Sequence, residues 1–288
     1  MPTLSIIIVS YNCYKLLTDC LASIRRSNDI GGELEIIVVD NGTDGTYEKL
    51  QESSLPDLKC IKVENRGFGA GNNAGVKIAS GKYYLFLNPD TIIPEPVFSF
   101  AAEKFSQDTK LGCFGVKMLD SNGNNTNSIT LRYFLGFWRH QLNRILTGLG
   151  IYLPDRMYTS GAGLFVRAET FKLIGGFDEE FFLYCEEPDI CNRVNSAGYK
   201  CGYFPKKSIF HLEGKTSEAG LAAKYIVQLR AWKHYCEKYG IDFKKTAKEE
   251  KLYCRFKSVV FKAINKEKSA EYVKIVEALD AFLNGGQL

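Results

Sequence analysis

Asp90 is the acidic residue of the run Asn88-Pro89-Asp90, which follows an apolar stretch at positions 83–87. Proline cannot donate to a sheet ladder, so a strand over 83–87 must end there. The ending leaves one carboxylate at the carboxyl end of a strand that reads as central in a sheet. Asp90 is therefore the first residue of this chain that is placed for chemistry.

A second candidate is an acidic cluster at positions 178–189, interleaved with aromatic residues that are typical of a core. Burial beside apolar groups raises the pKa of a carboxyl group, which suits a general base. Glu179 and Glu180 are expected in a solvated turn. Glu186 and Glu187 follow an aromatic, strand-like run and precede Pro188, which is expected to block helix continuation, and they are the favoured functional pair.

A third candidate is His211, which follows another strand-like run. A lone histidine is most often a satisfied core or surface group. This one precedes a loop with Gly214, Lys215, Thr216 and Ser217. An imidazole together with an ammonium group and hydroxyls can serve a metal ion and a phosphate at once.

These residues must be positioned by alternating strands and helices. Apolar, β-rich runs at 4–9, 34–39, 58–63 and 83–87 predict strands, and 14–26, 46–52 and 70–79 predict the helices between them. This alternation indicates an α/β fold with a parallel sheet covered on both faces. After about residue 110 the alternation is less regular, and from about residue 219 onward the pattern predicts helices.

Ligands of such sheets bind outside the carboxyl ends of the strands. All four predicted strands end in polar residues, namely Ser10-Tyr11-Asn12, Asp40-Asn41-Gly42, Glu64-Asn65-Arg66-Gly67 and Asn88-Pro89-Asp90. Polar strand-to-helix turns are ordinary loop chemistry, but four in register indicate one binding site.

A glycine-rich stretch offers a different interpretation. Gly69-Ala70-Gly71-Asn72-Asn73-Ala74 matches the G-x-G-x-x-A outline of a dinucleotide-binding loop. The dinucleotide-binding fingerprint normally follows the first strand of a fold, whereas this stretch follows the third predicted strand. The alternative is that these glycines permit a tight turn and close helix packing.

The bulk composition excludes several classes of protein. The chain has 288 residues and a net charge of +4, too weak a basic excess to indicate a nucleic-acid partner. Its nine cysteines are irregularly spaced without C-x-x-C, which favours reduced thiols in a cytosolic protein over a disulfide framework or zinc site. The first residues lack a signal-peptide pattern, and no apolar run is long enough to span a membrane.

Taken in order, these motifs resemble those of the inverting glycosyltransferases of family 2, which have the GT-A nucleotide-diphospho-sugar fold. Beyond the four strand ends, the matching residues are Asp44, Gly45 and Thr46, Asn72 to Gly75, Gly161 to Gly163, Gly175 to Glu179, Phe181 and Phe182, Glu186 and Glu187, Arg193 and His211. The resemblance is nearest to rhamnosyltransferase-like members, which read Asn-Pro-Asp where others read Asp-x-Asp.

The resemblance implies a mostly parallel central sheet flanked by helices, with a helical C-terminal extension. The catalytic domain would cover residues 1–218, with a nucleotide-binding half at about 1–110 and an acceptor-binding half at about 111–218. Residues 219–288 would form the extension.

The resemblance also implies residue roles. Asp90 would bind a divalent metal, Mg²⁺ or Mn²⁺, with His211, and Asn88 stands where the family's other acid would be. Ser10, Tyr11, Asn12 and Asp40 would line the nucleoside pocket, and Arg66 and Gly67 would lie along the nucleotide. Glu187 would be the base that deprotonates the acceptor, with Glu186 as the alternative, and Lys215 and Ser217 would contact the leaving group.

The expected reaction is inverting, metal-dependent transfer of a sugar, with rhamnose the first candidate, from a dTDP- or UDP-linked donor. The acceptor would be a saccharide or a polyprenyl-linked lipid in cell-surface polysaccharide synthesis. A nicotinamide-dependent oxidoreductase and a non-catalytic nucleotide-sugar-binding protein stay open as alternatives. Homodimerisation is also left open.

Two segments predict a cytoplasmic protein that works at the inner face of the cell membrane. Residues 134–149 place Phe134, Trp138, Leu142, Ile145 and Leu149 on one helical face, as in an interfacial helix. Residues 244–268 carry nine basic and three acidic side chains, a net charge of +6. The alternative is that the first is a core or dimer helix and the second a solvated helix.

Overall fold

The computed structural model describes residues 2–53, 58–133, 135–212 and 220–286. The chain forms two compact units, which are described separately. The first comprises residues 1–130, 152–182 and 186–216, and the second comprises 131–151, 183–185 and 217–288, in each case as far as they are described.

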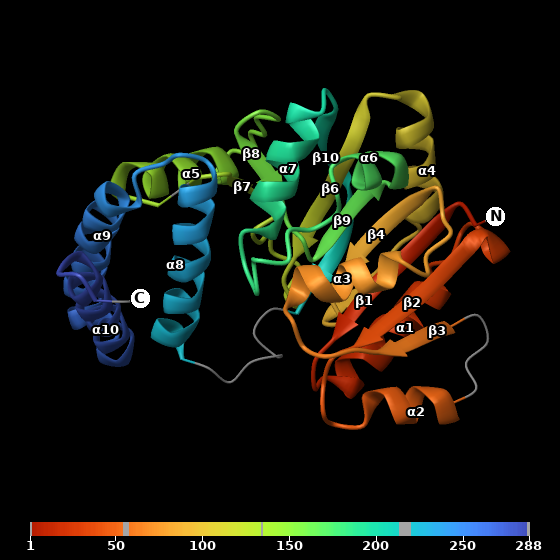
Figure 1. The fold of residues 1–288 in the computed structure, drawn as a ribbon, viewed down its shortest axis with the longest axis horizontal. Coiled ribbons are helices and arrows are strands. Elements are labelled where there is room, and N and C mark those ends of the chain that lie inside the picture. The colour runs from red at the N-terminus through yellow and green to blue at the C-terminus, as the bar shows by residue number, and fades with distance from the viewer. Residues whose placement is uncertain (1, 54–57, 134, 213–219, 287–288) are drawn as a thin grey trace. The chain divides into compact units, whose positions relative to one another are not determined.

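The first unit is built on a sheet that, among the described residues, has eight strands in the order β3-β2-β1-β4-β9-β6-β10-β5 (Figure 1). Neighbours run parallel except where β9 meets β4 and β6 and where β5 meets β10, so the sheet is mostly parallel, as expected. The strands are β1 (Leu4–Ser10), β2 (Leu34–Asp40), β3 (Leu58–Lys62), β4 (Tyr83–Leu87), β5 (Thr91–Ile92), β6 (Leu111–Leu119), β9 (Gly163–Arg167) and β10 (Lys200–His211). A separate pair is formed by β7 (Ile129–Leu131) and β8 (Met157–Thr159).

Helices cover both faces of this sheet because successive strand residues point to opposite sides. On β1, Ile6 and Ile8 lie in one apolar core with α1 and α4, whereas Ile7 and Val9 lie in a second core with α3, α6 and α7. The continuous apolar runs that predicted buried strands therefore serve two cores. The helices are α1 (Tyr14–Arg26), α2 (Thr46–Glu52), α3 (Phe68–Val76), α4 (Phe98–Gln107), α6 (Ala168–Leu173) and α7 (Glu186–Ser196).

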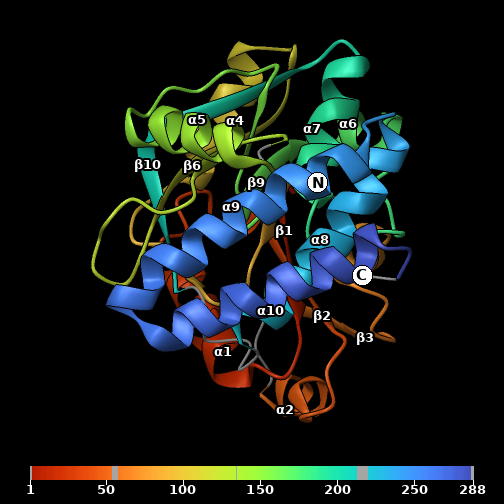
Figure 2. The same cartoon turned by 90° about the vertical axis from the view of Figure 1, so that its left-hand side faces the viewer.

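The second unit is helical. It contains α5 (Phe137–Gly148), α8 (Leu221–Lys238), α9 (Phe243–Ile264) and α10 (Lys266–Leu283), and α9 and α10 lie side by side (Figure 2). Asp242 and Asn265 begin α9 and α10 as N-caps, because their side chains accept from the backbone N–H groups of Lys245 and Lys268. Within the described ranges, no helix is long and apolar enough to cross a membrane.

Polar contacts of one buried carboxylate hold α5 on α9. Glu250 of α9 is 0% exposed and accepts from the backbone N–H of Gly136, which precedes α5, at 2.6 Å. The Nε2 atom of His140 on α5 lies 3.0 Å from both carboxylate oxygens, and the hydroxyl of Tyr225 on α8 donates to one of them. The His140 ring also stacks on Tyr253, with centroids 3.9 Å apart. Three helices thus meet at Glu250.

We predict that Glu250→Ala destabilises the helical unit strongly, because it removes the buried carboxylate that accepts from Tyr225 and the Gly136 N–H and contacts His140. The expected loss is on the order of 3 kcal/mol in the free energy of unfolding, measured by urea denaturation. The matched control is Glu249→Ala, which removes a half-exposed ion pair with Arg139 and should cost at most about 1 kcal/mol. Equal losses for the two variants would contradict this role for Glu250.

Candidate functional site

Asp90 and His211 are brought together by the antiparallel pairing of two strands of the first unit. His211, the last residue of β10, pairs with Thr91 of β5, and the backbone N–H of Leu212 donates to the Asp90 carbonyl at 2.9 Å. This register places Nε2 of His211 3.3 Å from Oδ1 of Asp90, whose side chain is only 4% exposed. The two residues expected to share a metal ion are therefore neighbours.

Asn88 completes this group. Its Nδ2 lies 3.4 Å from the same imidazole nitrogen, and among the described residues its buried Oδ1 has no hydrogen-bond partner. A buried acceptor without a hydrogen-bond partner destabilises the folded state, so a bound ligand that contacts this oxygen would stabilise the site. A carboxylate oxygen, an amide oxygen and an imidazole nitrogen are suitable ligands for Mn²⁺ and, through the oxygens, for Mg²⁺. The residues present thus fit a divalent metal.

Glu187 is connected to this group through residues 161 and 162. The backbone N–H of Gly161 donates to Oε1 of Glu187 at 3.0 Å, and the carbonyl of Ala162 accepts from the backbone N–H of Asn88 at 3.1 Å. A Cβ atom at position 161 would lie 2.3 Å from Oε1 of Glu187, so the close approach requires glycine. One short segment therefore positions the carboxylate of Glu187 relative to the end of β4.

The environment of Glu187 suits a proton acceptor. Burial raises the pKa of Glu187 above its ordinary value, and the N–H groups of Glu187 and Gly161 and the nearby His211 offset part of that increase. A carboxylate with a raised pKa is a stronger base than a solvated one.

One expectation about the acidic pair is wrong. Pro188 does not block a helix, because α7 begins at Glu186 and Pro188 lies in its first turn. Proline is tolerated there, since the first N–H groups of a helix have no partner within the helix. Glu186 is buried on the same helix, 3% exposed.

Farther along α7, Asp189 and Arg193 secure the segment that leads to the helix. Arg193 donates to Oδ2 of Asp189 from Nε at 2.9 Å and from a terminal nitrogen at 2.6 Å. It also donates to the carbonyls of Ile174 and Gly176 at 2.7 and 2.6 Å. Arg193 belonged to the motif set without a role, and its position identifies it as a residue that holds this loop.

Four residues expected at the nucleoside pocket lie at the ends of β1 and β2. Tyr11 is half-exposed, whereas Ser10 is buried with its hydroxyl 3.4 Å from the Cys13 sulfur. Asn12, at φ 50°, accepts from the N–H of Thr43 at 2.7 Å and so joins the two strand ends. Asp40 is fully buried, and its two oxygens accept from the N–H groups of Gly42 at 3.1 Å and Tyr47 at 3.0 Å. Asp40 thus shapes the turn before α2.

Arg66 and Gly67 lie against the segment that precedes α7. Arg66 forms an exposed ion pair with Glu179 at 3.2 Å. Gly67 has φ 102°, and a Cβ atom there would lie 2.3 Å from the carbonyl oxygen of Phe182, so only glycine fits. Asn73 completes the contact, because its side-chain amide exchanges two hydrogen bonds of 2.9 Å with the backbone of Phe177. The turn that follows β3 and the segment that precedes α7 therefore pack closely against each other.

The glycine-rich stretch packs rather than forming a phosphate loop. Gly69 and Gly71 lie within α3, and Cβ atoms at Gly71 and Gly75 would lie 2.9 Å from Val9 and 2.6 Å from Ile7. These glycines let α3 approach β1, which favours close helix packing over the dinucleotide fingerprint.

Two expected leaving-group contacts, Lys215 and Ser217, lie outside the described residues. The segment Gly161-Ala162 and the residue Asn73 were part of the motif set, but no role had been derived for them. Only the folded backbone shows what they touch.

A model of the family "Glycosyl transferase family 2" matches residues 5–171. This is more than half of the chain, and the protein belongs to this family. Its fold is a GT-A-like α/β fold with a helical C-terminal region, as the motifs predicted.

Among curated proteins, the rhamnosyltransferase WbbL of Escherichia coli is 25% identical over 222 residues, covering 72% of this chain and 82% of WbbL. An N-acetylglucosaminyl-diphospho-decaprenol L-rhamnosyltransferase of Mycobacterium tuberculosis is 23% identical, covering 72% and 75%. Chondroitin synthase of E. coli is 26% identical over 205 residues, but this match spans only 29% of that longer protein. The O-antigen biosynthesis protein RfbC of Myxococcus xanthus is matched over 15% of its length.

The fold also resembles solved structures. Mannosyltransferase PcManGT from Pyrobaculum calidifontis, solved in complex with GDP-Man and Mn²⁺, matches with a TM-score of 0.63 at 17% identity, over 100% of this chain and 76% of that one. S. aureus TarS matches with a TM-score of 0.54 at 16% identity, over 98% and 92% of the two chains. At these identities the likeness concerns the fold.

Proposed function

We propose that this protein is an inverting, metal-dependent glycosyltransferase that moves a sugar from a nucleoside-diphosphate donor to a saccharide or lipid-linked acceptor. The observation that carries the proposal is the connection of Glu187 to the Asn88, Asp90 and His211 group through Gly161 and Ala162. Rhamnose is the first candidate sugar, with a dTDP or UDP carrier, because two relatives are named rhamnosyltransferases.

In this proposal the chain's own residues divide the work. Asp90, His211 and Oδ1 of Asn88 would hold the metal ion, which when bound would supply Lewis-acid stabilisation of the departing nucleoside diphosphate. Glu187 accepts the proton of the acceptor hydroxyl as its oxygen attacks the anomeric carbon. The Gly161 N–H fixes the orientation of that carboxylate. Since neither hydride transfer nor simple binding needs a carboxylate with a raised pKa there, this arrangement favours transfer over both alternatives.

We predict that Glu187→Gln lowers turnover by about 100-fold or more while donor binding is retained. For the wild type, activity should fall as the pH drops through the raised pKa of Glu187, so the acid limb of the pH profile should lie above the ordinary carboxyl value of about 4.3. This limb should be absent from the residual activity of Glu187→Gln.

The thermal stability of Glu187→Gln shows whether a loss of activity comes from the chemical step or from unfolding. A raised folded-state pKa means that ionised Glu187 disfavours the folded state at pH values above its unfolded-state pKa. Glu187→Gln, which keeps an acceptor for Gly161, should therefore melt no lower than the wild type at neutral pH. The matched variant is Glu186→Gln. If it is inactive while Glu187→Gln is active, the base is Glu186.

We also predict that Asp90→Asn abolishes transfer and weakens Mn²⁺ binding in the presence of UDP, measured by titration calorimetry. The substitution keeps the side-chain shape and removes the only charged oxygen ligand of the proposed set. The exposed Asp155 provides a matched Asp→Asn control that should leave both quantities unchanged. Full wild-type activity in excess chelator would refute metal dependence.

A second observation, on the helical unit, concerns where the enzyme works. Trp138, Leu142, Ile145 and Leu149 of the expected stripe are all exposed, Trp138 by 80%, whereas Phe134 lies outside the described residues. Helix α9 exposes a second apolar stripe with Leu252, Phe256, Val259, Val260 and Ile264. Phe137, Trp138, Leu252 and Phe256 line one shallow pocket, so the two stripes are continuous.

Exposed basic residues border the α9 stripe. Lys248 lies one turn before Leu252, and Arg255 and Lys262 lie one turn from Val259 on either side. We propose that this surface, defined by the two apolar stripes and their basic border, rests on an anionic lipid leaflet at the inner face of the membrane. Apolar side chains would enter the interface, and each basic residue would add on the order of 1 kcal/mol.

We predict that the protein co-sediments with anionic vesicles at low salt and less so at high salt, because the basic border is screened. The double variant Trp138→Glu and Leu252→Glu should reduce the bound fraction at least tenfold. Leu173→Glu, at an exposed leucine of the first unit, should not. Absence of binding at low salt, or a stable dimer that the double variant dissociates, would contradict the membrane proposal.

A further inference from the structure

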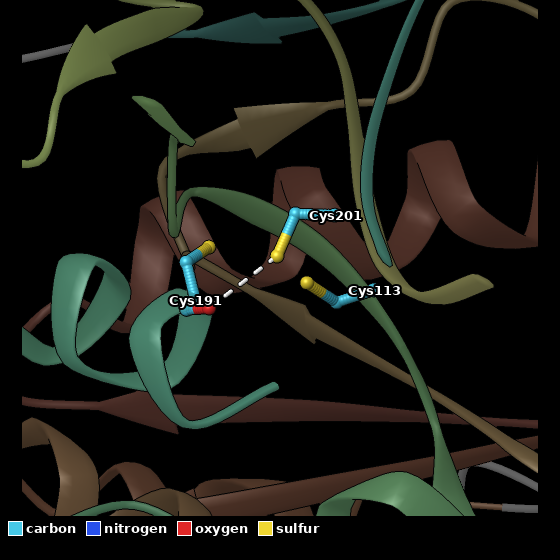
Figure 3. A group of neighbouring side chains, drawn as sticks. All are labelled: Cys113, Cys191 and Cys201. Carbon is cyan, nitrogen blue, oxygen red and sulfur yellow. Dashed lines mark hydrogen bonds between the residues drawn. The ribbon is translucent and has the colours of Figure 1, made fainter. Parts of the chain in front are cut away.

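Three cysteines that are far apart in the sequence converge in the core of the first unit. The sulfur atoms of Cys113, Cys191 and Cys201 all lie within 4.8 Å of one another (Figure 3). They come from β6, α7 and β10, so no short motif announces them. All nine cysteines lie in the described part of the chain, and none of them forms a disulfide.

The convergence follows from the topology. Cys113 and Cys201 are paired residues on the neighbouring parallel strands β6 and β10, so their side chains lie on the same face of the sheet. Helix α7 covers that face and contributes Cys191, whose carbonyl lies 3.6 Å from the Cys201 sulfur. The three side chains are buried in the second apolar core, together with Val166 and Val194.

The spacing suits coordination by sulfur. With bonds to sulfur of about 2.3 Å and the angles of about 100° of a pyramidal three-coordinate centre, two sulfur ligands lie about 3.5 Å apart. Each pair of sulfur atoms, now within 4.8 Å, would therefore need to approach by at most about 1.3 Å. Three sulfur atoms on three different elements also favour coordination over a disulfide, which would join only two of them.

Charge selects the kind of ion. In an apolar core, a complex with a net charge is strongly disfavoured. Three thiolates give a net charge of −1 with a divalent ion and −2 with a monovalent ion, but a neutral complex with a trivalent centre.

We propose that Cys113, Cys191 and Cys201 form a three-thiol binding site for a trivalent thiophilic centre, of which arsenic(III) is the probe. The reaction with arsenous acid, As(OH)₃, forms three As–S bonds and breaks three As–O bonds. The three thiol protons leave with the three hydroxyl groups as three molecules of water. Nothing is oxidised or reduced, and no charge is left in the core.

The site would affect the rest of the unit through α7. Cys191 follows Glu187 by four residues, one turn of the same helix. Occupation of the site therefore ties α7 to β6 and β10 close to the carboxylate that the proposed function uses. Binding at the site does not depend on that function, because it is measured directly.

The test exposes the reduced full-length protein to arsenite and records X-ray absorption at the arsenic edge. The expected result is three sulfur neighbours and no oxygen neighbour. Native mass spectrometry should show one arsenic gained and three hydrogens lost. An adduct that keeps a hydroxyl group and loses only two hydrogens would overturn the three-thiol site, as would no binding.

Variants locate the site. Cys191→Ala should lower arsenic affinity at least tenfold and lose the three-sulfur signature, and Cys113→Ala and Cys201→Ala should do the same. The matched control is Cys20→Ala, which removes another fully buried thiol, on α1, and should change neither readout. Because the absorption and mass measurements on the wild type need no variant, a variant that fails to fold leaves the proposal testable. Displacement of bound arsenic by equimolar Zn²⁺ would contradict the inference that the apolar core favours a trivalent over a divalent centre.

Discussion

Two backbone hydrogen bonds organise the candidate active site. The N–H of Asn88 donates to the carbonyl of Ala162, and the N–H of Gly161 donates to the carboxylate of Glu187. The first fixes the segment before β9 to the end of β4, and the second fixes the first turn of α7 to that segment. Asp90 and His211 are then placed by the pairing of β5 with β10. Backbone N–H groups and one strand pairing thus set the positions of side chains that come from distant parts of the chain.

In the helical unit, polar contacts hold α5 in place, while several of its apolar side chains are exposed. Helix α5 is attached to its neighbours by the buried carboxylate of Glu250, through His140 and the N–H of Gly136. On the same helix, the ring of Phe137 contacts those of Tyr253 and Phe256 on α9, whereas Trp138 is largely exposed. An amphipathic helix normally buries its apolar face in its own protein. Here Trp138, Leu142, Ile145 and Leu149 are exposed, and the proposed membrane contact would cover them.

Much of the fold could be predicted from the sequence, and the reasons are physical. The continuous apolar runs at 4–9 and 34–39 and the helical periodicity at 14–26 are strong local signals, and the strands and helix formed there. Proximity of Asp90 and His211 depends on the β5–β10 pairing, which no local pattern encodes, and only the resemblance to a family suggested it. The helical start at Glu186 was missed because Pro188 was treated as a breaker, although the first turn tolerates it. The thiol cluster was invisible because spacing along the chain does not reveal proximity across strands.

In the proposed reaction, Glu187 assists a single displacement at the anomeric carbon. The most direct measurement is the anomeric configuration of the first sugar product, observed by NMR during donor hydrolysis in a screen of dTDP- and UDP-linked sugars with Mn²⁺. The account predicts a product whose configuration is inverted relative to the donor. A product that retains the donor configuration would contradict it, because retention requires either two displacements or attack from the face of the leaving group.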